Sequence, residues 1–581
     1  MTGLPFVPHY DPQSDFLITR SDSPEIRERM LSLGATAAVR DGFTAYLWNS
    51  RLGDRFLLGV GVLDGQLLLG PRRLGVFPAR LGAGNYTVVE LSESGAVVQP
   101  DLFGMNTVYY SESLVTNRLH LAAMVARRVD ADNALSSTYN DGGFSFSFNT
   151  FKTPVQGVSL LPAGARVAVS RAALSVTRTD SSDEFVTCEP EDYWALIERG
   201  AQEVVDNVVA VVDSGLPVFA DITGGRDSRV VFGALVAAGK QREVVFNTIA
   251  NPATEGLRAD LEIGTGLVSH YGGTYSERPR AAGYAEHSVD QQLQRRRSQV
   301  FGAYHWIVPT DLRTVTSLGT SRTIRMLGGG GELYRDYWRP MLFTSVDPDE
   351  RANDENVYAM LSRHRTGALG LRHFDRYSRD LVETFRDLPG ETMGHKLDAH
   401  YLNFRNRFHF GSRQTSAESM STLNVATSPA LLAASRALPA RERASGRVLF
   451  DVIKELDEEL AYLPFDKPED PAIRSSRFHR RSRYDTTVLD LAPAVHLAKD
   501  VADRRGFLRP RHPNVEPLDF ESVLDSEITA AVGIISDPAS PFSFVVDEEL
   551  ESSIEWARAY SPRNRSSFAS KLRAFADFSL L

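Results

Sequence analysis

The pattern of hydrophobic and polar positions changes character near residue 180. Before that point, short apolar or alternating runs are separated by Gly, Pro, Asp and Ser, which is typical of strands joined by turns. One segment, at 119–129, instead has apolar residues at helical spacing. We therefore predict a β-rich domain over residues 1–185, with strands at 45–48, 55–62, 66–69, 87–91 and 166–169.

After a short polar linker at 179–184, predicted strands alternate with predicted helices. The first helix begins after Pro190, with acidic residues in its first turn and apolar residues along one side. This alternation is typical of a parallel, doubly wound α/β sheet. From about residue 375 the chain is predicted to be mostly helical, so the second domain covers 186–581. Its predicted core elements are strands at 216–222, 244–249 and 323–327 and helices at 228–239 and 255–270.

Composition narrows the class of protein. With 581 residues, 42% of them hydrophobic, the chain is long enough for two or more domains with their own cores. The net charge of −10 argues against a nucleic-acid partner. No run approaches the ~18 apolar residues of a membrane span and the first residues lack signal-peptide features, so we expect a cytoplasmic protein with no membrane partner. Cys188 is the single cysteine, which excludes an intramolecular disulfide and cysteine-based metal clusters.

The most informative segment is Thr223-Gly224-Gly225-Arg226-Asp227-Ser228, which links a predicted strand to a predicted helix. Adjacent glycines let backbone N–H groups turn toward one anion, and the helix N-terminus adds further donors. The hydroxyls of Thr223 and Ser228 can donate to the same anion. We interpret Asp227 as a magnesium ligand beside a phosphate. The alternative is a strand–turn–helix corner that uses glycine only for tightness.

This segment resembles the pyrophosphate loop, Ser-Gly-Gly-x-Asp-Ser, of the ATP pyrophosphatase superfamily, with Thr223 in place of the first serine. Two segments, 69–76 and 153–164, are similar to a turn and a closing segment in the glutaminase half of asparagine synthetase-like enzymes. The resemblance implies a degenerate glutaminase-type αββα sandwich in residues 1–185 and a synthetase domain in 186–581. It also implies that the synthetase domain binds ATP and Mg²⁺ and adenylates a carboxylate.

A second glycine-rich segment, 324–335, lies where that family has Ser-Gly-Glu-Gly-x-Asp-Glu-Leu-Phe. Glu332-Leu333-Tyr334 fits the ending, whereas glycines replace the family's earlier Glu and its magnesium-binding Asp. Glu332 or Asp336 is therefore expected to supply the second metal ligand, since Mg²⁺ needs few protein carboxylates. The alternative is that the four glycines form a flexible bend. We assign Gly330, within this segment, to the nucleotide site.

Two further residues complete the expected nucleotide site. Asp260 matches the family's Asp at the start of the helix after the second strand, although a solvated helix-start acid is the alternative. Asn247 lies at the end of the second strand, where backbone groups can contact an adenine edge.

The ammonia-producing members of the family use a cysteine at residue two, but this chain has Thr2. Glutamine hydrolysis by a thiolate is therefore not expected at the usual place. β-Lactam synthetases and lasso-peptide cyclases, which lack that cysteine, let a substrate amine attack the adenylated carboxylate. The resemblance thus implies amide-bond formation, including lactam or macrolactam formation, with small-molecule or peptide carboxylate and amine substrates.

Candidates for the catalytic residues come from the same resemblance. Related lactam-forming enzymes use a Tyr–Glu pair and a late Lys, for which Tyr401, Glu418 and Lys467 are the candidates, with a surface or core role as the alternative for each. The basic stretch 474–483 is either an anion clamp or a solvated loop. Two other functions stay open: a nucleotide-binding pseudoenzyme or regulatory subunit, and an adenylating enzyme that acts on a nucleoside or glycan.

Overall fold

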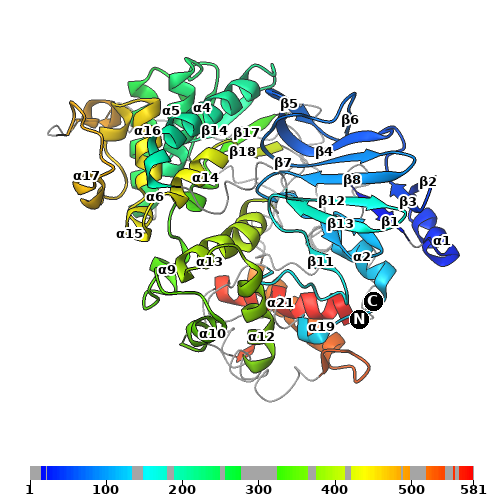
Figure 1. Ribbon diagram of the computed structural model, residues 1–581. Helices are drawn as coiled ribbons and strands as arrows, with labels where there is room; N and C mark the ends of the chain where they lie inside the picture. The colour runs from blue at the N-terminus through cyan, green and yellow to red at the C-terminus, as the bar shows by residue number, and fades with distance from the viewer. Residues whose placement is uncertain are drawn as a thin grey trace.

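The chain forms a mixed α/β structure, with antiparallel sheets in its N-terminal region and a parallel sheet further along (Figure 1). This coarse prediction of fold class is confirmed. The computed structural model describes residues 15–20, 22–133, 148–178, 189–248, 255–275, 323–363, 374–411, 421–485, 489–496, 519–543, 554–555 and 562–579.

Two antiparallel sheets build the N-terminal region, and the predicted strands of residues 45–169 all fall within them. The first sheet has the order β11 (Ser159–Leu160), β9 (Tyr109–Tyr110), β10 (Leu114–Thr116), β1 (Phe16–Thr19), β3 (Phe43–Leu47), β2 (Thr36–Arg40). The second has the order β13 (Leu174–Arg178), β12 (Ala165–Ser170), β8 (Gly95–Pro100), β7 (Leu81–Leu91), β4 (Arg55–Leu63), β5 (Gln66–Leu69), with β6 (Arg72–Arg73) paired to β4.

Alternation along β1 shows how these sheets pack. Phe16 and Ile18 point into a core shared with Phe56 of the second sheet. Leu17 points the opposite way, into a core that includes residues of helices α1 (Pro24–Ser32) and α2 (Leu119–Ala126). A helix–sheet–sheet arrangement results. Helix α2 ends earlier than predicted because Arg127 adopts a left-handed conformation, with φ of 52°.

The outer face of the second sheet is covered differently from the predicted αββα sandwich. In the described part of the chain, β4, β5 and β7 contact helix α4 (Tyr193–Val212), which belongs to the predicted second domain. A single hydrophobic core accordingly includes Val60 and Val62 of β4 together with Val204 and Val208 of α4. This core crosses the boundary near residue 185, whereas the core between the two antiparallel sheets contains only residues that precede it.

The later sheet is entirely parallel, in the order β16 (Thr274–Tyr275), β15 (Val245–Asn247), β14 (Val218–Asp221), β17 (Ile324–Leu327), β18 (Ser421–Asn424). The first strand in the chain, β14, lies in the middle of the sheet. The next two, β15 and β16, lie on one side of it, and β17 and β18 lie on the other. The strand order therefore reverses between β14 and β17. The carboxyl ends of these two strands are where open α/β sheets usually bind ligands.

Helices surround this sheet and make up most of the described C-terminal part, as predicted. α5 (Arg226–Ala237) and α6 (Glu255–His270) follow β14 and β15, close to their predicted positions. Within the described residues, no helix is both long enough and apolar enough to cross a membrane. The other helices named in the described ranges are η2 (Pro190–Asp192), η3 (Gly331–Tyr334), α9 (Trp338–Met341), α10 (Asp354–Arg363), α12 (Phe374–Asp387), α13 (Met393–His400), the π-helix η4 (Tyr401–Gly411), α14 (Pro429–Arg436), α15 (Ala440–Ala444), α16 (Arg447–Leu456), η6 (Leu460–Tyr462), α17 (Ala472–Ser475), α19 (Phe520–Ile535) and α21 (Pro562–Ser579).

Candidate functional site

The loop after β14 is closed by its own hydroxyl groups. The Thr223 N–H donates to Ser228 Oγ at 3.0 Å, and the two side-chain oxygens lie 2.9 Å apart. The Gly225 N–H donates to Thr223 Oγ1 at 3.1 Å. These residues therefore lie together at the start of α5. Gly225 is the N-cap of α5 and has no side chain to accept from the first N–H groups of the helix, which suits an anion as their acceptor.

The side chain of Asp260 contacts the backbone of this loop. The Gly224 N–H donates to Asp260 Oδ1 at 3.0 Å, so one of the amides expected to face an anion is satisfied by a carboxylate. On its other side, Gly224 O accepts from the Asp466 N–H at 3.1 Å. A Cβ on Gly224 would lie 2.9 Å from Asp466 Cβ, which explains why glycine is needed there.

The glycines after β17 are packed against the first loop. A Cβ on Gly328 would lie 2.5 Å from the backbone nitrogen of Ser228, and one on Gly331 would collide with Asp227 Oδ1. Gly330 has φ of 102° and lies against Thr427. This close packing disfavours the alternative of a free flexible bend. It gives a steric reason for glycines where the family pattern has acidic residues.

Asp227 and Glu332 lie on either side of an arginine that the sequence analysis did not single out. Arg335 Nη2 is 3.7 Å from Asp227 Oδ2 and 3.5 Å from Glu332 Oε1. Burial, and then the charge of Glu332, raises the pKa of Asp227 to about 7. The second oxygen of each carboxylate, Asp227 Oδ1 and Glu332 Oε2, is buried and has no hydrogen-bond partner among the described residues.

Two carboxylates with unpartnered oxygens suit a cation that takes few protein ligands and keeps several waters, as Mg²⁺ does. Within the described ranges, no group of three or more His, Cys, Asp or Glu residues is arranged to hold a metal ion. The donor set therefore fits Mg²⁺ shared with a phosphate and does not fit a cation that needs an all-protein cage.

Asp336, the other candidate for the second metal ligand, lies elsewhere. Its Oδ2 accepts from Arg339 Nε at 2.6 Å, and burial followed by the charge of Asp398 raises its pKa. Asp398 in turn pairs with Arg436 at 2.6 Å and with Arg443 at 3.1 Å. The structure places Asp336 in this separate buried ion cluster and does not bring it to Asp227.

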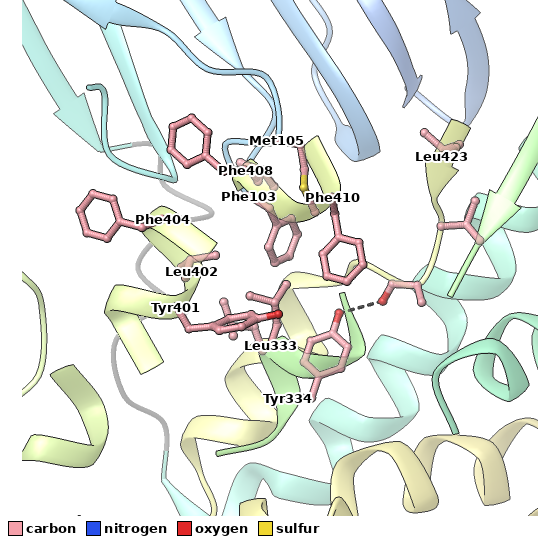
Figure 2. Close-up of a cluster of buried hydrophobic side chains, with 14 of the residues drawn as sticks. Phe103, Met105, Leu333, Tyr334, Tyr401, Leu402, Phe404, Phe408, Phe410 and Leu423 are labelled. Carbon is pink, nitrogen blue, oxygen red and sulfur yellow. Dashed lines mark hydrogen bonds between the residues drawn. The ribbon is translucent and has the colours of Figure 1, made fainter. Parts of the chain in front are cut away.

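The candidate catalytic residues divide into three cases. Lys467 follows Asp466 on the segment that touches Gly224, and its charge opposes the burial-driven rise in the pKa of Asp260. Tyr401 is only 2% exposed and packs against Tyr337, with ring centroids 4.6 Å apart, inside the cluster drawn in Figure 2. Glu418 lies outside the described residues, as do Thr2 and Cys188.

Tyr401 nonetheless lies near the acid pair. Burial is the largest cause of its raised pKa, and the charge of Glu332 is the next. In Figure 2 its ring lies beside Leu333 and near Tyr334, the two residues that follow Glu332 in η3. Tyr401 therefore packs behind the second loop as a core residue.

Asn247 ends β15 beside the first loop. Its carbonyl accepts from the Ile222 N–H at 3.0 Å, and its Oδ1 is buried with no hydrogen-bond partner among the described residues. The structure thus places Asn247 next to the residue that precedes Thr223, at the carboxyl end of the sheet.

Arg229 is a structural residue of this site that the sequence did not reveal. It is fully buried, and its guanidinium group lies 3.7 Å from the centre of the Phe465 ring. It donates to the carbonyls of Leu460 at 3.2 Å and Leu463 at 2.9 Å. Arg229 thereby holds the segment before Lys467 against α5. No motif or spacing in the sequence indicates this contact.

The basic stretch 474–483 fits the solvated-loop alternative better than an anion clamp. Three of its arginines pair with acidic residues: Arg474 with Glu469 at 2.9 Å, Arg480 with Glu198 at 2.9 Å and Arg483 with Glu458 at 3.7 Å. These arginines lie largely on the surface.

No known family model matches the chain, and no curated protein matches it significantly. The function therefore has to be argued from the geometry of this site.

Proposed function

We propose that this protein is an ATP-dependent carbon–nitrogen ligase that adenylates a carboxylate, releases pyrophosphate and AMP, and joins the acyl group to a substrate amine. One observation carries the proposal. Asp227 and Glu332, from the loops after β14 and β17, meet at the reversal point of a parallel sheet, next to the open N-terminus of α5.

The same place supplies groups for the phosphates. The N-terminus of α5 offers backbone donors and the positive end of the helix dipole. The hydroxyls of Thr223 and Ser228 lie at its first turn, and Arg335 places a cation beside the acid pair. This combination of donors favours a polyanion over a neutral ligand.

Asp227 and Glu332 would hold Mg²⁺, which when bound neutralises charge on the departing pyrophosphate. In the first step a carboxylate oxygen bonds to the α-phosphorus and the bond from that phosphorus to the bridging oxygen breaks. The loop donors and Arg335 stabilise the negative charge that leaves with pyrophosphate. In the second step the amine attacks the acyl carbon and AMP departs, with the amine proton taken by a base.

For that base, Lys467 has the most support because its segment contacts the Gly224 loop. Tyr401 is less suited to this role, since burial raises its pKa far above the usual range.

The first test measures, by calorimetry, how tightly magnesium and α,β-methylene ATP bind to the full chain and to the Asp227→Asn variant. The matched control is Asp349→Asn, an exposed acid outside both loops. We expect at least tenfold weaker binding for Asp227→Asn and no change for the control. The proposal fails if the wild type does not bind the analogue or if Asp227→Asn binds it equally well.

The second test is release of pyrophosphate from ATP over a panel of amino-acid and peptide carboxylates. Turnover with any of them supports the ligase. Binding without turnover favours the second candidate function, a nucleotide-binding pseudoenzyme. Two contacts favour that candidate: Asp260 occupies the Gly224 amide, and Arg335 lies between the two carboxylates.

A further inference from the structure

A cavity of about 510 Å³ lies where the second antiparallel sheet meets α4 and the start of α14. Its size is within the range of small-molecule sites. In Figure 1 this sheet lies beside the parallel sheet, and both β7 and β4 contact β18. The cavity is distinct from the acid pair described above, because neither Asp227 nor Glu332 lines it.

The charge of the lining is positive. Three arginines, Arg80, Arg166 and Arg199, line the cavity together with one acidic residue, Glu203. Arg80 pairs with Asp206 at 2.9 Å, Arg166 Nε donates to Thr177 Oγ1 at 3.3 Å, and Arg199 Nε lies 3.9 Å from Glu203 Oε1. A guanidinium group carries five N–H donors, so an arginine that holds one acceptor can still bind a carboxylate or phosphate in its fork geometry.

Hydrogen bonds tie together the segments beside the cavity. Asn207 is almost fully buried and bridges two segments, because its Oδ1 accepts from the Ala83 N–H at 3.4 Å and its Nδ2 donates to Val425 O at 3.1 Å. Tyr334 binds the loop between β18 and α14, since its hydroxyl donates to Ala426 O at 2.7 Å and accepts from the Ser428 N–H at 2.9 Å. These bonds connect β7, α4 and the segment between β18 and α14 at the edge of the cavity.

Apolar groups complete the lining and limit the ligand class. Phe77, Leu81, Leu102 and Pro429 contribute carbon surface next to the arginines. A ligand with anionic groups and a small carbon body matches both parts of this lining. We propose that this interdomain cavity binds a small organic anion through Arg80, Arg166 and Arg199.

The test uses the full chain without nucleotide, so that it is independent of the ligase proposal. Binding of citrate, succinate and inorganic phosphate is measured by calorimetry at constant ionic strength. The double variant Arg80→Gln/Arg166→Gln removes two cations from the cavity. The matched control, Arg51→Gln/Arg128→Gln, removes two exposed arginines outside it and keeps the same net charge as the test variant.

We expect saturable binding of citrate or succinate to the wild type and at least a tenfold loss in the cavity variant, with the control unchanged. Binding of inorganic phosphate alone would contradict the proposal, because phosphate has no carbon body to contact the apolar part of the lining. The proposal is overturned if no anion binds saturably, or if the cavity and control variants lose affinity equally. Circular dichroism of both variants verifies that each is folded.

Discussion

Asp101 shows how a single buried charge can set the pH response of this fold. It is 1% exposed, and its two carboxylate oxygens accept from the Met105 N–H at 2.9 Å and the Asn106 N–H at 2.7 Å. Burial outweighs these bonds and the nearby Arg407, and it raises the pKa of Asp101 to about 7. The folded chain thus binds a proton here that the unfolded chain releases near pH 4.

Between about pH 4 and 7 the folded state binds more protons at Asp101 than the unfolded state, so its contribution to the free energy of unfolding falls as pH rises. We predict that Asp101→Asn is destabilised relative to the wild type, and that this difference shrinks by more than about 1 kcal/mol from pH 5 to 8. Urea unfolding of both proteins at several pH values measures it. A difference that stays constant with pH would contradict this assignment.

At the scale of elements, the packing of the β17 loop against the start of α5 creates the acid pair. This packing depends on Gly328 and Gly331, because a Cβ on either would meet atoms of Ser228 or Asp227. The glycines therefore matter for shape as much as for conformational freedom. The carboxylate of Glu332 reaches the site only because the loop lies this close to Asp227.

We predict that Gly331→Ala weakens binding of magnesium and α,β-methylene ATP at least tenfold, because the added Cβ displaces the Asp227 carboxylate. Gly256→Ala on α6, where a Cβ meets no atom within 4 Å, is the matched control and should bind normally. Calorimetric titration of both variants distinguishes the outcomes. Equal affinity of the Gly331→Ala and Gly256→Ala variants would show that the close packing of Gly331 against Asp227 does not affect nucleotide binding.

Elements also show where sequence patterns stop being informative. The strands at β14, β15 and β17 were predictable because each is a buried apolar run between turn residues. β18 was missed, since Ser421-Thr422-Leu423-Asn424 holds one large apolar residue and lies in a region with helical character. Its pairing with β17, a contact between distant parts of the chain, makes it a strand.

At the scale of the whole molecule, one of the hydrophobic cores joins the two predicted domains. Residues of β4 and β7 pack against α4 and β18, and Arg80 pairs with Asp206 across the same boundary. Separation of the two parts would expose Val60 and Val62 to water. Burial of such side chains stabilises a fold by about 1.5–3 kcal/mol each.

We predict a single calorimetric unfolding transition for the full chain. The fragment 1–185 should lack a cooperative transition and bind a hydrophobic dye, because the outer face of its second sheet has lost its cover. Differential scanning calorimetry of both proteins provides the measurement. Two resolved transitions in the full chain, or a cooperatively folded fragment, would show that the parts are independent.

The sequence by itself determined the mixed α/β class, most strands and helices of the central sheet, and the loop of Thr223, Gly224, Gly225, Asp227 and Ser228. These features are local: apolar periodicity, turn residues and adjacent glycines act over a few positions. Only the tertiary structure decided that Glu332 and Arg335 lie beside Asp227, and that Asp336 lies in the buried ion cluster of Asp398. Such contacts depend on how distant segments pack, which no spacing along the chain encodes.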